Sequence, residues 1–91
     1  MDAAPSLTRR FATEIRALIS ATETCLPGAG EDREAQLQRE AFRERCERAM
    51  ALASRLSAAT PEEAGRLDGD AWRARESLVL SLDFFRRRSV G

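Results

Sequence analysis

Apolar residues recur along most of the chain at intervals of three and four, the spacing that places them on one face of an α-helix. In the middle of the chain this spacing joins Phe42, Cys46, Ala49, Ala53 and Leu56. Leucines and a phenylalanine also alternate over positions 78–84, as in a strand, but no other segment offers a partner strand. The pattern therefore predicts an all-α protein.

After Leu56 the apolar spacing is interrupted at Thr60–Glu63, where the composition is that of a helix start. Thr60 suits the N-cap, Pro61 suits the first helical position, and Glu63 is placed to bond back to the backbone N–H of Thr60. The spacing then resumes at Ala64, Leu67, Ala71, Ala74, Leu78, Leu82 and Phe85. We therefore expect the chain to fold back at residue 60 as a long antiparallel helical hairpin.

We expect residues 1–91 to form a single helical domain, a three-helix bundle built on this hairpin. Its parts are a frayed tail at 1–5, helices at about 6–26, 31–59 and 61–88, and turns at 27–30 and 59–61. Ser6 is the expected N-cap of the first helix. The third helix contains Asp68-Gly69-Asp70, which either bends it or ends it with Asp70 as a fresh N-cap; the unbroken apolar spacing favours one continuous helix.

With the turn centred on residue 60, positions whose numbers add to about 120 should face one another across the hairpin. The predicted layers are Leu56 with Ala64, Ala53 with Leu67, Ala49 with Ala71, Cys46 with Ala74, Phe42 with Leu78 and Ala35 with Phe85. Together with the first helix, this register predicts a core of Phe11, Ile15, Leu18, Phe42, Leu78, Leu82 and Phe85. The stretch from Leu78 to Phe85 is apolar nearly all round, so it is either the most buried segment or a contact surface.

The first helix should leave one end of the hairpin uncovered. Its length of ~30 Å is shorter than the ~42 Å of each hairpin arm. If its pairing starts at Glu31, it ends near residue 50 and leaves the turn at residue 60 open. The candidate partner-binding residues in or beside the open end are Met50, Leu52, Leu56, Leu67 and Trp72. Trp72 either covers the alanine layers from the core edge or anchors a partner, as tryptophan does at interface hot spots.

The amino-acid composition argues against some classes of function but does not identify one. Lys and Arg together number 15, as do Asp and Glu, so the net charge is zero, and every basic residue is an arginine. A neutral chain argues against general nucleic-acid binding, which calls for a basic excess. No apolar run is long enough to span a membrane. The first residues lack the features of a secretory signal, so we expect a cytoplasmic protein.

Catalytic and metal-binding patterns are missing from the sequence. The 2 cysteines and the lack of histidine leave too few ligands for an ordinary zinc or copper site. In the expected bundle Cys25 and Cys46 lie ~21 Å apart, so we predict two free thiols. Arg39 should lie near Asp83 and form a salt bridge at the edge of the bundle. We expect no enzyme activity, no cofactor and no metal.

These observations favour a non-enzymatic protein–protein interaction module, such as a small adaptor, chaperone or accessory subunit. It would bind a partner helix or form a homo-oligomer through the hairpin. The alternative is a small helical transcriptional or nucleic-acid-binding regulator that uses Arg86–Arg88 together with Arg9, Arg10 and Arg16. Because these arginines do not cluster in the expected bundle, we do not expect nucleic acid as the partner.

Overall fold

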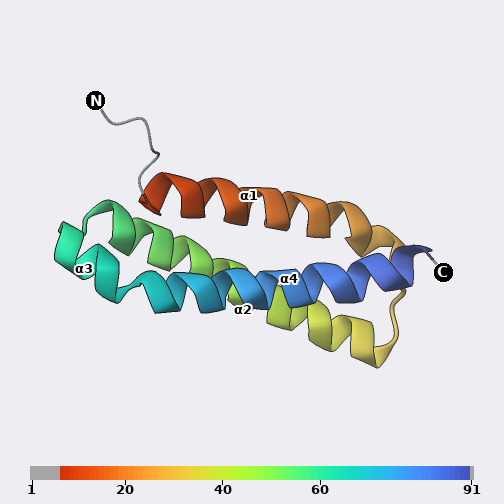
Figure 1. Cartoon of the computed structure of the whole chain (residues 1–91). Coiled ribbons are helices and arrows are strands. Elements are labelled where there is room, and N and C mark those ends of the chain that lie inside the picture. The colour runs from red at the N-terminus through yellow and green to blue at the C-terminus, as the bar shows by residue number, and fades with distance from the viewer. Residues whose placement is uncertain (1–6, 91) are drawn as a thin grey trace.

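The computed structural model describes residues 7–90, and the regular structure in that range is helical throughout. The elements are α1 (Leu7–Cys25), the short 3-10 helix η1 (Leu26–Gly28), α2 (Arg33–Ser57), α3 (Pro61–Arg66) and α4 (Asp68–Val90). The long helices pack against one another, which confirms the all-α helical bundle (Figure 1). The predicted tail at 1–5 and the N-cap at Ser6 lie outside the described residues.

The bundle is a hairpin of α2 and α4 with α1 laid along it (Figure 1). α1 runs antiparallel to α2 and parallel to α4, and its broader contact is with α4. One ion pair reports this pairing, since Glu14 Oε2 in α1 lies 3.5 Å from Arg75 Nε in α4. The three long helices all extend along the long dimension of the molecule, two in one direction and one in the other (Figure 1). The molecule is therefore elongated, with extents of 48 × 23 × 15 Å.

The predicted helix start at residue 60 is a complete capping box. The Glu63 backbone N–H donates to Thr60 Oγ1 at 3.2 Å, and the Thr60 backbone N–H donates to Glu63 Oε1 at 3.0 Å. Pro61 occupies the first helical position. The turn thus satisfies two backbone donors that a helix start would otherwise leave without partners, which explains why a new helix begins here.

The helix expected over 61–88 is two helices in the structure, α3 and α4, with Leu67 between them. Backbone hydrogen bonds still cross the junction, from Leu67 N–H to Glu63 O and from Ala71 N–H to Leu67 O. The interruption therefore falls at Leu67, which is buried, and not at Asp70. Gly65 and Gly69 on either side have no side chain and low helix propensity, so the backbone can adjust locally to turn Leu67 into the core.

The expectation that α1 stops near residue 50 of the hairpin is wrong. Arg9 and Ala12 of α1 line a groove together with Leu56 and Ala59, close to the turn at residue 60. The starting point of the pairing explains the error. α1 follows α4, and the first half of α2 diverges from α1 (Figure 1), so the pairing of α1 does not begin at Glu31. The first helix consequently covers the turn end that the sequence left open.

The connection between α1 and α2 is held from two sides by arginines. Arg39 Nη2 donates to the Leu26 carbonyl at 2.9 Å, and the Arg88 guanidinium reaches the Ala29 carbonyl at 3.5 Å. Arg88 also forms salt bridges with Asp32 and, at 2.7 Å, with Glu34. Arg39 therefore has a backbone partner in the loop.

The predicted salt bridge between Arg39 and Asp83 is accordingly wrong, because Asp83 pairs with Arg87, one turn further along α4, at 3.0 Å. An i,i+4 partner on the same helix is in reach of a carboxylate without any tertiary adjustment. Arg39, in turn, is close to the loop because η1 lies at the end of α1.

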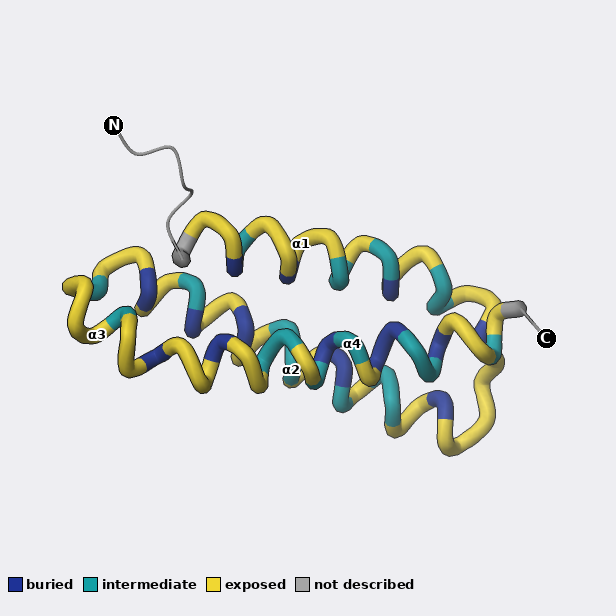
Figure 2. The backbone as a smooth tube through the Cα atoms, in the orientation of Figure 1, coloured by how far each residue is buried: buried dark blue, intermediate teal, exposed yellow. Residues whose placement is uncertain are grey.

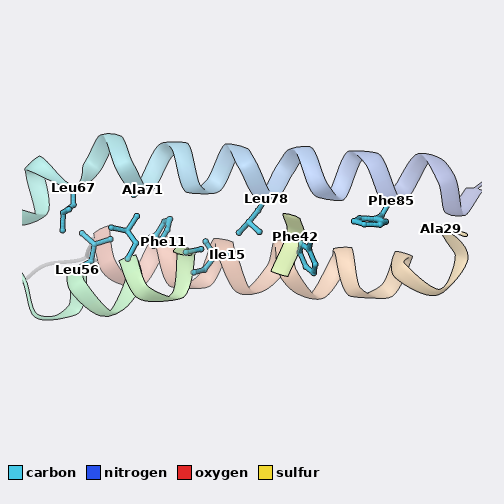
Figure 3. Close-up of a cluster of buried hydrophobic side chains, with 11 residues drawn as sticks. Phe11, Ile15, Ala29, Phe42, Leu56, Leu67, Ala71, Leu78 and Phe85 are labelled. Carbon is cyan, nitrogen blue, oxygen red and sulfur yellow. The ribbon is translucent and has the colours of Figure 1, made fainter. Parts of the chain in front are cut away.

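Every residue of the predicted layers is buried or half-buried. Phe42 packs edge to face on Phe85, with ring centroids 6.4 Å apart, a contact between two of the predicted layers. Leu78, the predicted partner of Phe42, belongs to the same buried cluster (Figure 3).

The core runs along the inward sides of all three long helices (Figure 2). Six of the seven predicted core residues are buried and Leu18 is half-buried. Of the eight residues from Leu78 to Phe85, four are buried and three are half-buried, whereas Leu80 faces solvent. Ser81 in the same segment is fully buried, and its Oγ accepts a hydrogen bond of 2.7 Å from Arg45 Nη1.

Candidate functional site

The structure divides the five candidate partner-binding residues into two groups. Leu52, Leu56 and Leu67 are buried, with exposed fractions of 7%, 2% and 9%. Figure 3 shows Leu56 and Leu67 at the α3 end of the apolar cluster, together with Phe11 from α1. Met50 and Trp72 remain at the surface, so only these two of the five present large apolar side chains to solvent.

Trp72 borders a groove of about 350 Å³ between α1 and α4. Its side chain is 60% exposed, although Ala71 beside it is buried in the core. The guanidinium of Arg75 lies over the indole ring, with its carbon 5.2 Å from the ring centroid. Arg75 is itself held by the 3.5 Å ion pair to Glu14 of α1. Trp72 is therefore an exposed aromatic side chain beside a groove in which Glu14 and Arg75 form an ion pair.

Met50 lies on the other flank of α1. It is four residues beyond Cys46 and seven before Ser57, so the three side chains share one stripe of α2. Ser57 lines the groove between α1 and α2 together with Thr13. Because α1 lies between this stripe and the groove of Trp72, the two exposed residues do not form one patch.

A further groove, of about 670 Å³, runs between α2 and α4 on the side where α1 contributes no lining residue. We call it the arginine groove, after its lining residues Arg45, Arg48, Arg55 and Arg73. Its apolar lining residues are Ala51, Leu52 and Ala74. Asp70 supplies the carboxylate of the groove. The protein is neutral overall, so this groove concentrates positive charge locally.

The arginines of this groove differ in their partners. Arg73 Nη1 lies 3.1 Å from Asp70 Oδ1, and Arg55 is close enough to Glu63 to help lower the pKa of that carboxyl, after the larger effect of the hydrogen bonds from Thr60. Arg45 donates to Ser81 Oγ and, at 3.3 Å, to the Ser77 carbonyl.

Among the described residues, neither Arg45 nor Arg48 has a carboxylate oxygen within 4.0 Å of its guanidinium. Both guanidinium groups thus lack a carboxylate counter-charge among these residues, although Arg45 Nη1 already donates to Ser81 Oγ and to the Ser77 carbonyl. The sequence holds a signal for this groove, since Arg45, Arg48, Leu52 and Arg55 share one stripe of α2, but Arg73 joins it only through the packing of α4.

The arginines of the nucleic-acid alternative lie at opposite ends of the bundle. Arg9 and Arg16 line the groove near Leu56. Arg88 is paired with Asp32 and Glu34 at the far end. Between the levels of Ala71 and Arg88, α4 rises about 25 Å. One nucleic-acid backbone would have to follow the whole bundle to meet both groups.

The two cysteines are free thiols, as predicted, and both are half-buried. Burial raises the pKa of the Cys46 thiol, and the carboxylates of Glu23 and Glu47 raise it further. A raised pKa keeps the thiol protonated at neutral pH and lowers its reactivity. Cys46 therefore acts as a small side chain packed against the core.

Within residues 7–90, no three cysteine or carboxylate side chains gather as a set of metal ligands. None of the helices described here has both the length and the apolar content needed to cross a bilayer. No protein-family model, curated protein or solved structure matches the chain. The fold defines the protein as an all-α helical bundle.

Proposed function

We propose that the protein is a non-enzymatic protein-interaction module that binds a helix of a partner protein, with Trp72 as the anchor. The observation that carries this proposal is the 60% exposure of Trp72 at the edge of a groove. A tryptophan held at the surface exposes a large apolar area to water, and tryptophan is among the commonest hot-spot residues of interfaces.

The environment of Trp72 supports a role in binding, and not merely an exposed position without a role. Arg75 lies over the ring and is itself paired to Glu14, so the indole is oriented before any partner arrives. An ordered anchor loses less side-chain entropy on binding than a freely rotating one. Phe11 and Ala71, both largely buried, line the same groove.

The sole tryptophan provides a direct test. The chain has 1 Trp and 0 Tyr, so its intrinsic fluorescence reports on residue 72 alone. We expect an emission maximum typical of a solvated indole and strong quenching by acrylamide in the free protein. Partners are first captured with the protein as bait. When such a partner is added to the free protein, the Trp72 emission should shift to shorter wavelength and acrylamide should quench it less.

The mutational arm compares Trp72→Ala with Met50→Ala, which removes another exposed apolar side chain on the opposite flank of α1. Trp72→Ala should weaken partner binding by about 2 kcal/mol or more, while Met50→Ala should leave it unchanged. Equal losses in both variants, or binding that survives Trp72→Ala, would remove the proposed function.

A further inference from the structure

We propose that the arginine groove binds an acidic amphipathic helix of a partner protein, which lies between α2 and α4 as a fourth helix of the bundle. This site is separate from the groove of Trp72. It lies on the α2–α4 side to which α1 contributes nothing. The inference therefore goes beyond the proposed function and stands on its own observations.

Charge complementarity identifies the occupant. Four arginines line the groove against the single carboxylate of Asp70. That carboxylate is already paired with Arg73, and Arg45 and Arg48 have no carboxylate partner among residues 7–90. An incoming helix with glutamates or aspartates at its flanks would supply the missing counter-charges, and guanidinium–carboxylate pairs are strong and directional.

The apolar lining selects a helix over a bare anion. Ala51 and Ala74 give the groove small apolar side chains, which allow a helix to approach closely, and the buried Leu52 also lines it. Between Arg45 and Arg55, α2 rises about 15 Å, which matches about three turns of a bound helix. Phosphates of a nucleic acid or lipid headgroups would satisfy the arginines but not this apolar surface.

The neighbouring surface extends the same combination of groups. Leu80, which is 62% exposed, lies three residues beyond Ser77 on the stripe of α4 that borders the groove. Leu37, also exposed, lies eleven residues before Arg48 on the matching stripe of α2. An amphipathic helix that continues past the arginines would meet these two leucines.

The test uses a synthetic helical peptide of about 14 residues, with leucine and alanine on one face and glutamates on both flanks of that face. Its binding to the full chain is measured by fluorescence anisotropy. The control peptide carries glutamine in place of every glutamate. Arg48→Glu reverses one unpaired charge of the groove, and Arg43→Glu makes the same change at an exposed position of α2 outside it.

We expect the acidic peptide to bind, to bind less tightly as salt is added, and to lose at least about tenfold in affinity with Arg48→Glu. Arg43→Glu and Trp72→Ala should leave its affinity unchanged, and circular dichroism should show intact helices in all variants. Because Trp72→Ala is neutral here, failure of this site is distinct from failure of the proposed function.

Four results would overturn the proposal. The acidic peptide does not bind; the glutamine peptide binds as tightly; or Arg43→Glu weakens binding as much as Arg48→Glu. The fourth is that another occupant binds the groove more tightly than the acidic peptide does, and that Arg48→Glu abolishes the binding of this other occupant. A short DNA duplex, vesicles with anionic phosphatidylglycerol, and light scattering of the chain alone test for nucleic acid, membrane and a second copy.

Discussion

Arg88 shows how one side chain can join segments that are far apart in the sequence. It pairs with Asp32 and Glu34 at the start of α2 and reaches the Ala29 carbonyl in the loop. Its guanidinium carbon also lies 5.0 Å from the centroid of the Phe84 ring. The sequence alone does not distinguish the three arginines Arg86–Arg88 at the end of the helix. In the folded protein, Arg88 differs because it connects α4 to the start of α2.

The pairing of Arg88 makes stability depend on pH in the acid range. The hydrogen bond from Arg88 is the main cause that holds the pKa of the Asp32 carboxyl below its ordinary value of 3.8. Because the folded chain resists protonation at this site, the carboxylate stabilises the fold above that value. The contribution is lost as the pH falls from there through the lowered pKa.

We expect Asp32→Asn to be less stable than the wild type at about pH 7, and this difference to shrink as the pH falls to about 2. Urea denaturation followed by circular dichroism at a series of pH values measures it. A difference that stays constant over the whole range would show that the charge of Asp32 contributes nothing.

At the scale of elements, the sequence is sufficient to predict a feature when the interactions that form it join residues close together in the chain. The Thr60 capping box depends on residues three apart, and both of its hydrogen bonds are present as predicted. The interruption at Leu67 was not predictable from spacing, because the apolar stripe keeps its phase there. Burial of Leu67 in the assembled bundle decides it, and that burial depends on residues distant in sequence.

The glycines of α4 and the loop allow the element scale to be tested. A Cβ added at Gly69 would meet nothing within 4 Å, so Gly69→Ala should stabilise the protein by about 0.5–1 kcal/mol through helix propensity. A Cβ added at Gly28 would lie 3.1 Å from Ser89 Cβ, so Gly28→Ala should not stabilise it. Thermal and urea unfolding of both variants measure these changes, and a gain at Gly28 equal to that at Gly69 would contradict the packing of η1 on α4.

At the scale of the whole molecule, the helices, their directions and most of the core residues could be predicted from the sequence, but the candidate site could not. The position of α1 depends on the conformation of the loop that follows it. The spacing of apolar residues predicts neither the divergence of α2 from α1 nor the contact of η1 with α4. For that reason Leu52, Leu56 and Leu67 are buried where an open end was expected. The arginine groove depends in the same way on two helices packing together.

The small core makes single aromatic side chains decisive for folding. Phe85 is fully buried and contacts the rings of Phe42 and Phe84, with centroids 6.4 Å and 5.1 Å away. Phe85→Ala should cost about 3–5 kcal/mol, a large part of the about 5–15 kcal/mol that typically stabilises a domain.

The matched control is Leu80→Ala, on the same helix but exposed, which should change stability by less than about 0.5 kcal/mol. Urea unfolding of the two variants gives both values. Similar effects in the two would mean that the far end of α4 does not pack as described.

The loop held by Arg39 and Arg88 has a consequence for how copies of the chain can meet. In a domain-swapped dimer, α1 would leave its own hairpin and take the same place on a second molecule, with residues 26–32 as the hinge. That hinge would first have to release the Leu26 carbonyl from Arg39 and the Ala29 carbonyl from Arg88. The two arginines thus oppose exchange of the first helix between molecules.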